Sequence, residues 1–241
     1  MELQHTRSTH DSHYALFFQH WNALSSIANR LHLGRNDFVF HANSPGKNVY
    51  ALLEGRIKLF RVSHSGRELI QWFCFPGEVF GFAEIPHNGE RGIYAQCCSD
   101  AVVLSIPERD FRHFIDTHPT FAIMVIEQLT LRLRTVGDML LNLTSDDAGM
   151  RIKKLLVRLC ARFGHWQGDI IVLDVSLTHQ ELADMSGTCR QTVTSVLNTL
   201  KRKGILQIER QRILILQPAL FDESVEATPY KAFHDKMKSM G

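Results

Sequence analysis

One stretch of the chain places polar side chains at a spacing that suits hydrogen bonding to another molecule. In GTCRQTVTSVLNTLKRKGIL, Gly187 to Leu206, apolar residues recur every three or four positions, as in a helix with one buried face. The other face carries Arg190, Gln191, Thr194, Ser195 and Lys201. An arginine can hold O6 and N7 of guanine with two donors, and a glutamine can pair with N6 and N7 of adenine. Arg190 and Gln191 therefore predict a helix that contacts the edges of DNA bases, while Thr194, Ser195 and Lys201 could reach bases or phosphates.

The residues just before this stretch predict a shorter helix. Thr178 and Glu181 form the T-x-x-E pattern of a capping box, so we expect a helix from about His179. The helix should end at Ser186 and Gly187, because glycine can take the left-handed backbone that often closes a helix.

Two helices joined by such a turn form a helix–turn–helix, whose second helix presents its N-terminal residues to the major groove. We expect that helix to begin near Cys189 or Arg190. The sequence GILQIERQRILIL that follows alternates as two short strands around ERQR, which predicts a wing. A plain amphipathic helical hairpin is the alternative, but it leaves the capping box, the glycine, the polar face and the wing without a common cause.

Charge is distributed unevenly along the 241 residues, a length that suits two modest domains or one large one. Residues 148–217 hold 11 Lys and Arg against 5 Asp and Glu, a net charge of +6, whereas the rest holds 16 against 20. Such a basic excess suits a segment that meets a polyanion, with a chance fluctuation as the alternative. No apolar run approaches the roughly 18 residues of a membrane span. The N-terminus lacks a signal pattern, so we expect a cytoplasmic protein without a membrane partner.

The pattern changes between residues 34 and 107, where short apolar stretches alternate with turn signals about every eight to twelve residues. The stretches are DFVFH, VYALLE, RIKLFRV, ELIQWFCF, EVFGF, IYAQCC and AVVLSI. This rhythm predicts an antiparallel sandwich or barrel. Residues 1 to about 33 are expected to form a helix or an irregular lead-in, because FFQHWNALSSIANRL shows helical spacing.

Helix is expected again after Pro107. Within FAIMVIEQLTLRLRTVGDMLLNL, apolar residues follow spacings of 3, 4, 3, 4 and 3, the two-position seam of a coiled coil. The seam consists of Ile126, Leu129, Leu133, Val136, Leu140 and Leu143. It is narrower than the stripe of a helix packed on its own domain, so it favours a dimer helix over that alternative. A polar break, SDDAGM, follows as a hinge, and then an amphipathic helix to Gly164 and a strand within DIIVLDVS.

The order of these parts resembles the Crp–Fnr family of bacterial transcription regulators over about residues 30–217. The segments that carry the resemblance are LLEGRIKLF, SGRELIQWF, PGEVFGF and LTHQELADMSGTCRQTVTSVLNTLKRKGIL. The resemblance implies an α+β chain with an N-terminal antiparallel β-roll, a jelly roll like that of cyclic-nucleotide-binding domains. A long dimerisation helix and a C-terminal winged helix–turn–helix follow. It implies a homodimer that binds a palindrome in double-stranded DNA, and we expect RNA polymerase as a further partner.

The same resemblance suggests a division of the chain into four parts. The expected ranges are 1–120 for the effector-sensing roll with its lead-in, 121–145 for the dimerisation helix, 146–220 for the DNA-binding domain and 221–241 for a C-terminal tail. The resemblance does not cover the tail, to which the sequence assigns no role.

The resemblance also assigns roles within the helix–turn–helix. Arg190 takes the place of the arginine that contacts guanine, and His179 and Gln180 fall where the first helix contacts phosphate. Two positions depart from the family pattern, because Gln191 stands where Glu is common and Ser195 stands where a second Arg is common. The half-site is therefore not expected to match either well-known family consensus.

The sensing cassette departs from that of the cyclic-AMP members. Those members carry G-E-L-[GA] and then R-S-A, whereas this chain has GFAE and RGI. Val136-Gly137 replaces the Thr-Ser pair that holds adenine. These changes argue against cyclic AMP. Arg91 is kept as an anion partner, with a surface or salt-bridge role as the alternative. The effector pocket is expected at Gly81, Glu84, Arg91, Tyr94 and Gln96.

Cysteine and histidine content bears on two further cofactors. The iron–sulfur members use N-terminal cysteines and one in the roll, but this chain has no cysteine before Cys74 and has Leu104 at the roll position. A four-cysteine iron–sulfur cluster is therefore not expected. The 13 histidines show no H-x-H or H-E-x-x-H spacing, so no metal site is predicted. Haem remains a candidate cofactor, with the loop residues His41, His64 and His87 as candidate ligands. The alternative is that these histidines are simply solvated.

The five cysteines lack a C-x-x-C pair, which argues against a disulfide framework or a zinc knuckle. Cys97 and Cys98 are adjacent on a predicted strand, so only one can face the interior. Cys189 precedes Arg190 at a helix N-terminus on a basic surface, and both features favour the thiolate. We therefore expect oxidation of Cys189 to weaken DNA binding. The alternative is an inert small residue at the helix start.

Two other functions compete with a DNA-binding regulator. A cupin-like metal enzyme built on the roll needs clustered His and Glu ligands, which the roll sequence does not show. A cyclic-nucleotide-binding signalling module conflicts with the altered cassette. We therefore expect a regulator and not an enzyme. An effector would shift the long helix and set two reading helices about 34 Å apart, one turn of DNA.

Overall fold

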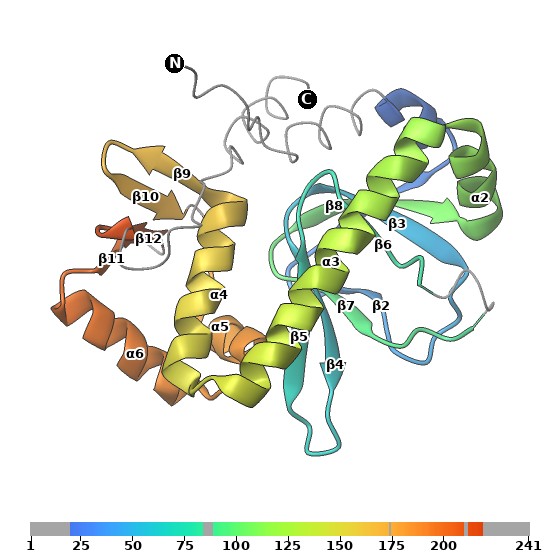
Figure 1. The fold of residues 1–241 in the computed structure, drawn as a ribbon. Helices are drawn as coiled ribbons and strands as arrows, with labels where there is room; N and C mark the ends of the chain where they lie inside the picture. Colours follow the sequence, from blue (N-terminus) through green and yellow to red (C-terminus); the bar gives the residue numbers. More distant parts are fainter. Residues whose placement is uncertain (1–19, 84–88, 174, 210–211, 219–241) are drawn as a thin grey trace. The chain divides into compact units, whose positions relative to one another are not determined.

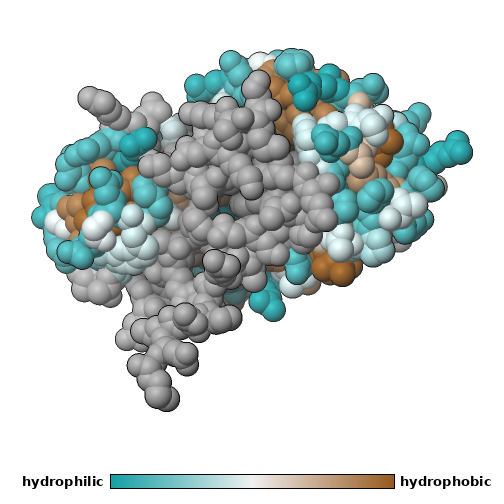
Figure 2. Space-filling view, turned by 90° about the horizontal axis from the view of Figure 1, so that it is seen from above, coloured by the Kyte–Doolittle hydropathy of each residue, from teal (hydrophilic) through white to brown (hydrophobic). Residues whose placement is uncertain are grey.

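The computed structural model describes residues 20–83, 89–173, 175–209 and 212–218. The chain forms two compact units whose boundary lies between Gly137 and Asp138, inside one long helix (Figure 1). Figure 2 shows that the described surface of both units is largely hydrophilic in that view, with smaller apolar patches.

The first unit is built on two antiparallel sheets. One has the strand order β1-β8-β3-β6 and comprises Asn29–Leu33, Ala101–Pro107, Asn48–Glu54 and Val79–Phe80. The other has the order β2-β7-β4-β5 and comprises Phe38–Phe40, Tyr94–Cys97, Ile57–Val62 and Glu68–Cys74. Strands β2 to β8 coincide with the seven apolar stretches, so the antiparallel roll predicted from the sequence is confirmed.

Alternation along the strands fills the roll with apolar side chains, because successive residues of a strand point to opposite faces. Along β7, Ala95 and Cys97 are buried, whereas Tyr94 and Gln96 are half-buried. Ala95 and Cys97 join a core cluster that includes Trp72. Cys98 was predicted on the same strand, but β7 ends at Cys97 and Cys98 lies just beyond it. Only Cys97 is buried, as expected, and Cys98 is partly buried.

The lead-in differs from the expectation of a helix or irregular segment up to about residue 33. Residues 20–26 are helical, but Asn29–Leu33 form the edge strand β1, which pairs with β8. Leu31 and Leu33 pack against the core. The polar residues of NRLHL obscured this strand in the sequence, because an edge strand exposes part of its surface to solvent.

Helix returns after Pro107 as α2, Glu108–Thr117, and α3, Pro119–Ser145. Gln128 of α3 packs on the turn before β6. Its Oε1 accepts a hydrogen bond from the Val79 amide at 3.1 Å, and its Nε2 donates to the Gly77 carbonyl at 3.3 Å. The six residues of the predicted seam are between 44% and 74% exposed: Ile126, Leu129, Leu133, Val136, Leu140 and Leu143.

The described part of the second unit contains the end of α3, three further helices and one sheet. Asp147 lies in the predicted polar break and caps α4, Ala148–Phe163, by accepting a hydrogen bond from the Met150 amide at 2.8 Å. The sheet has the order β11-β12-β10-β9 and comprises Leu206–Glu209, Arg212–Ile215, Ile170–Leu173 and Gly164–Gln167. The pair β11–β12 is the predicted wing, and β10 is the strand predicted within DIIVLDVS.

Strand β9 was not predicted. The helix ends at Phe163 as expected, but Gly164 then begins a strand that pairs with β10. A Cβ at Gly164 would lie only 2.5 Å from the Cys160 carbonyl oxygen, so this helix-to-strand turn needs glycine. The segment GHWQ carries one large apolar residue, Trp166, and that residue is exposed, so no alternation marks the strand.

Candidate nucleic-acid interface and sensing domain

The helix–turn–helix begins with the predicted capping box. The Glu181 amide donates to Thr178 Oγ1 at 3.1 Å, and the Thr178 amide donates to Glu181 Oε2 at 2.7 Å. These two bonds satisfy amides that would otherwise be free at a helix start. They define α5 as His179–Ser186, as the sequence predicted.

The turn between the helices is left-handed at the predicted glycine. Gly187 has φ 63° and ψ 36°, and the Thr188 amide donates to the Ala183 carbonyl at 3.0 Å. A Cβ at Gly187 would lie 3.0 Å from Cδ2 of Leu143. The turn therefore restricts this position both in backbone conformation and in space.

Arg151 of α4 fixes this turn through its guanidinium group. Its Nε donates to the Ser186 carbonyl at 2.9 Å, and its Nη2 donates to the Gly187 carbonyl at 3.4 Å. Its Nη1 donates to the carbonyl of Asp146, in the break before α4, at 2.9 Å. This role of Arg151 was not predicted from the sequence, although a basic residue commonly binds the free carbonyls at a helix end.

Helix α6, Arg190–Arg202, divides into a buried and an exposed face, as its spacing predicted. Val193, Leu197 and Leu200 are buried, while Val196 is only partly so. The exposed face is hollowed in two adjoining places of about 500 Å³ each. The first is lined by Arg190, Gln191, Thr194, Ser195 and Asn198, and the second by Ser195, Asn198, Lys201 and Arg202.

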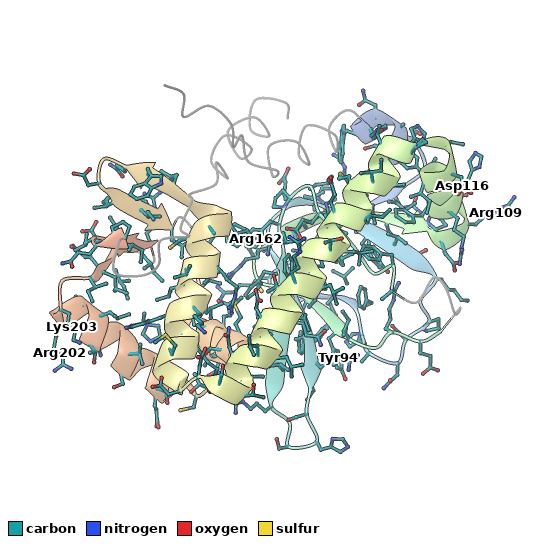
Figure 3. All side chains as sticks on the ribbon, viewed as in Figure 1. Tyr94, Arg109, Asp116, Arg162, Arg202 and Lys203 are labelled. Carbon is teal, nitrogen blue, oxygen red and sulfur yellow. The ribbon has the colours of Figure 1, made fainter. Side chains whose placement is uncertain are left out.

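The structure thus brings five of the seven predicted DNA-contacting residues onto one face of α6, and it adds Asn198 and Arg202. Their signal in the sequence was their spacing, since Asn198 follows Ser195 by three residues and Arg202 follows by seven. Arg202 and Lys203 lie at the C-terminal end of the helix (Figure 3). Cations at that end are also favoured by the helix dipole.

The two predicted residues on α5 are engaged within the protein. His179 Nδ1 lies 2.8 Å from Thr194 Oγ1, a hydrogen bond that links α5 to α6. The Thr194 hydroxyl also donates to the Arg190 carbonyl at 2.9 Å. Gln180 Nε2 donates to Asp184 Oδ1 at 2.8 Å. These bonds position the helices and occupy polar groups that the sequence analysis assigned to DNA.

Cys189 is exposed and forms the N-cap of α6. Its sulfur lies 3.1 Å from Thr192 Oγ1. Hydrogen bonding to the side chain and then the backbone of Thr192 lowers the pKa of the Cys189 thiol. Burial has the opposite effect elsewhere, because it raises the pKa of Cys97 to about 11 and that of Cys160 to about 12.

In the sensing domain, the structure brings Arg91 and Gly81 together. Arg91 is only 1% exposed, and its Nη1 donates to the Gly81 carbonyl at 2.6 Å. Its Nη2 donates to the Asn48 carbonyl. The guanidinium also lies 4.4 Å from the ring centroid of Phe40 and 5.7 Å from that of Tyr50. These contacts hold the guanidinium inside the roll.

The other predicted pocket residues lie elsewhere. Tyr94 and Gln96 occupy the face of β7 opposite to the core residues. Tyr94 stacks on Phe60 with ring centroids 5.2 Å apart, and Gln96 donates to the Asn36 carbonyl at 3.0 Å. The structure therefore does not bring these two side chains to the buried face on which Ala95 and Cys97 lie. Glu84 and the loop residue His87 lie outside the described residues.

A largely buried polar cluster, which was not predicted from the sequence, connects α3 to the roll. Glu78 Oε2 accepts hydrogen bonds from Trp72 Nε1 at 2.8 Å and from Arg132 Nη2 at 3.2 Å. Arg132 Nη2 also donates to the Val79 carbonyl at 2.8 Å. Trp72 and Glu78 are buried, and the Arg132 side chain is 14% exposed. This Trp72–Glu78–Arg132 cluster joins β5, the turn before β6 and α3.

Two family models match the chain. The model described as a cyclic nucleotide-binding domain matches residues 30–118, and the model described as a Crp-like helix-turn-helix domain matches residues 150–223. The global nitrogen regulator of Nostoc sp. is 29% identical over 186 residues, which are 76% of this chain and 83% of that protein. The CRP-like cAMP-activated global transcriptional regulator of Mycobacterium tuberculosis is 28% identical over 181 residues, 75% and 81% of the two chains.

Solved structures show the same fold. A CooA mutant from Carboxydothermus hydrogenoformans superposes with a TM-score of 0.73 at 22% identity, over 85% of this chain and 90% of that chain. FixK2 from Bradyrhizobium japonicum gives a TM-score of 0.70 at 19% identity, over 84% of this chain and 98% of that chain.

The chain belongs to the Crp–Fnr family. It is a transcription regulator with a DNA-binding helix–turn–helix, and its homologues are regulators rather than enzymes.

Two features are absent from the described residues. No helix in that part of the chain is long and apolar enough to cross a membrane. Within the same ranges, no three His, Cys, Asp or Glu side chains gather as a metal site would require.

Proposed function

We propose that the chain acts as a homodimer that binds a palindrome in double-stranded DNA and that its roll transmits an effector or redox signal to the two α6 helices. One observation carries the DNA-binding part. On the exposed face of α6, the side chains of Arg190, Gln191 and Ser195 make no hydrogen bond within the described residues. Free donors and acceptors at the N-terminal half of a second helix are what recognition of base edges requires.

The proposed dimer is supported by the exposed seam of α3. Six apolar side chains spaced by three and four residues stand in water, which is unfavourable unless another surface covers them. A second copy of α3 matches this seam, because a regular a/d pattern is complementary to itself in a coiled coil. Two copies would also supply the two reading helices that a palindrome needs.

The proposed signal acts on α3. Gln128 and Arg132 bind the roll segment around β6 from one side of the helix, while the seam lies on the exposed side. An effector that moved this segment would therefore move the seam. The mycobacterial relative is named as cAMP-activated. We do not propose cyclic AMP as the effector of this chain, because Phe82 and Val136-Gly137 replace the residues that the cyclic-AMP members use. The absorption spectrum of the anaerobically purified protein tests for haem. The effect of peroxide on DNA binding tests for a thiol switch at Cys189.

We propose that the four expected residue ranges have separate roles. Residues 1–120 form the sensing part, 121–145 the dimer helix and 146–220 the DNA-binding domain, with 221–241 as a tail. We also propose a cytoplasmic location, which suits DNA as the ligand, and RNA polymerase as a partner at promoters.

The DNA-binding proposal is tested with the purified full chain and a library of random duplexes. We expect the parent to enrich a palindrome and Arg190→Ala to enrich none. Fluorescence anisotropy should then show tight binding of the enriched duplex and weak binding of a scrambled one of equal length. Equal affinity of the parent for both duplexes would contradict sequence-specific binding.

A further inference from the structure

Asn198 is the polar side chain at the centre of the exposed face of α6. It lines both hollows, together with Ser195 in each case. The first hollow extends toward Arg190 and Gln191, and the second toward Lys201 and Arg202. Asn198 therefore lies between the residues suited to bases and the residues suited to phosphates.

The carboxamide of Asn198 is available to a ligand. The residue is exposed, and its side chain makes no hydrogen bond with any other described residue. Two other polar side chains of the site differ from it, since Thr194 is bonded to His179 and to the Arg190 carbonyl and Gln180 is bonded to Asp184. An asparagine offers one acceptor and two donors in a plane, which fits N6 and N7 of adenine in the major groove.

Asn198 and Arg190 lie far apart along α6. Eight residues at about 1.5 Å each place Asn198 about 12 Å from Arg190 along the helix axis. Base pairs stack at about 3.4 Å, so a separation of about 12 Å along a helix that lies in the groove is enough for the two side chains to reach different base pairs. Ser195 lies between them with a short hydroxyl, which leaves room beside it in both hollows.

We propose that Asn198 is a specificity-determining residue that contacts an adenine in the major groove, at a base pair distinct from that contacted by Arg190. The proposal rests on the proposed DNA-binding function. The sequence pattern indicated base contacts only at the N-terminal part of α6, from Arg190 to Ser195. A contact at Asn198 would extend base recognition by about one helical turn toward the C-terminal end of the helix.

The experiment measures the full chain against its enriched palindrome and against every single base-pair replacement of one half-site. The parent should prefer an A·T pair at one inner position by about tenfold, a typical value for one good bidentate contact. Asn198→Ala should bind all four pairs at that position alike and keep the preferences elsewhere. Asn198→Asp should shift the preference there toward cytosine, because a carboxylate accepts from cytosine N4.

Two matched variants separate the outcomes. Lys201→Ala should weaken binding to every sequence alike and reduce the salt dependence, as expected for a phosphate contact. If Asn198→Ala behaves like Lys201→Ala, or like the parent, the proposal is wrong. If the parent itself has no preference at any position, and Arg190→Ala does not alter its affinity, then the DNA-binding function fails as well. Because Asn198 is exposed, thermal unfolding of its variants should match that of the parent.

Discussion

The three cysteines with shifted pKa values differ in what their thiols can do. Burial raises the pKa of Cys97 to about 11 and that of Cys160 to about 12, so both stay protonated and unreactive near neutral pH. Cys189 is exposed, and hydrogen bonding to Thr192 lowers the pKa of its thiol. Among these three residues, only Cys189 combines access with thiolate character.

We therefore predict that Cys189 reacts first with iodoacetamide and that this reaction weakens DNA binding. A lowered pKa means that the thiolate persists to lower pH than that of an ordinary cysteine. The alkylation rate should thus fall, as pH decreases, with a midpoint below the ordinary cysteine value. Mass spectrometry of the alkylated protein across pH gives the midpoint, and anisotropy gives the binding.

The control is Cys189→Ser, which should bind DNA like the parent and lose nothing on treatment with iodoacetamide or peroxide. A midpoint at or above the ordinary value, or unchanged binding after complete alkylation of Cys189, would contradict the prediction.

Residue spacing predicted the exposed face of α6 but not the state of each polar group on it. Thr194 follows Arg190 at helical spacing, yet its hydroxyl is bonded to His179 of the preceding helix. Arg151 serves the turn from another helix, 35 residues before Ser186. A side chain's partner in another element leaves no mark in local sequence, so base-contacting and structural polar residues look alike there.

Among the elements, the helices were better predicted than the short strands. The capping box at Thr178 and Glu181 and the glycine at Gly187 are local signals, and the ends of α5 follow from them directly. Strands β1 and β9 are held by pairing with β8 and β10. In β1 the alternation covers only Leu31 to Leu33, and β9 shows none. Their existence depends on neighbours that the sequence does not place nearby.

A largely buried ion pair between Glu78 and Arg132 contributes to the attachment of helix α3 to the roll. Glu78→Gln leaves the charge of Arg132 without its carboxylate, and Arg132→Met leaves that carboxylate without its cation. We predict that each change lowers the free energy of unfolding by about 3–5 kcal/mol, as is typical when one partner of a buried pair is removed. The double variant should lose less than the sum of the two, because neither charge is then left alone.

Urea unfolding followed by circular dichroism measures these values. Arg112→Ala provides the control, since Arg112 pairs with Glu108 one turn away on an exposed helix face and should cost only about 0.5 kcal/mol. Strictly additive effects of Glu78→Gln and Arg132→Met would contradict a direct interaction between the two residues.

At the scale of the whole molecule, the proposed dimer rests on the exposed leucines of α3. We predict that Leu133→Glu, at the most exposed of the six seam residues, converts the dimer to monomers, because it brings two like charges together at the seam. Sedimentation velocity at several concentrations measures the mass. DNA binding should fall with the loss of the dimer, since one half-site then binds alone.

Leu69→Glu is the matched control. Leu69 is also exposed, at 44%, but it lies on β5 outside the seam. This variant should remain a dimer. A monomeric parent, or a dimeric Leu133→Glu protein, would contradict the proposed interface.

Leu143 belongs to the proposed dimer seam and also lies beside the turn before α6. It is the last residue of the seam, and its Cδ2 lies 3.0 Å from the position that a Cβ of Gly187 would occupy. In evolutionary terms, this leucine is under two independent selective constraints if the seam is the dimer contact. A substitution that altered partner choice at the seam would also disturb the turn before α6. We therefore expect paralogues that keep Gly187 to vary less at position 143 than at the other seam positions.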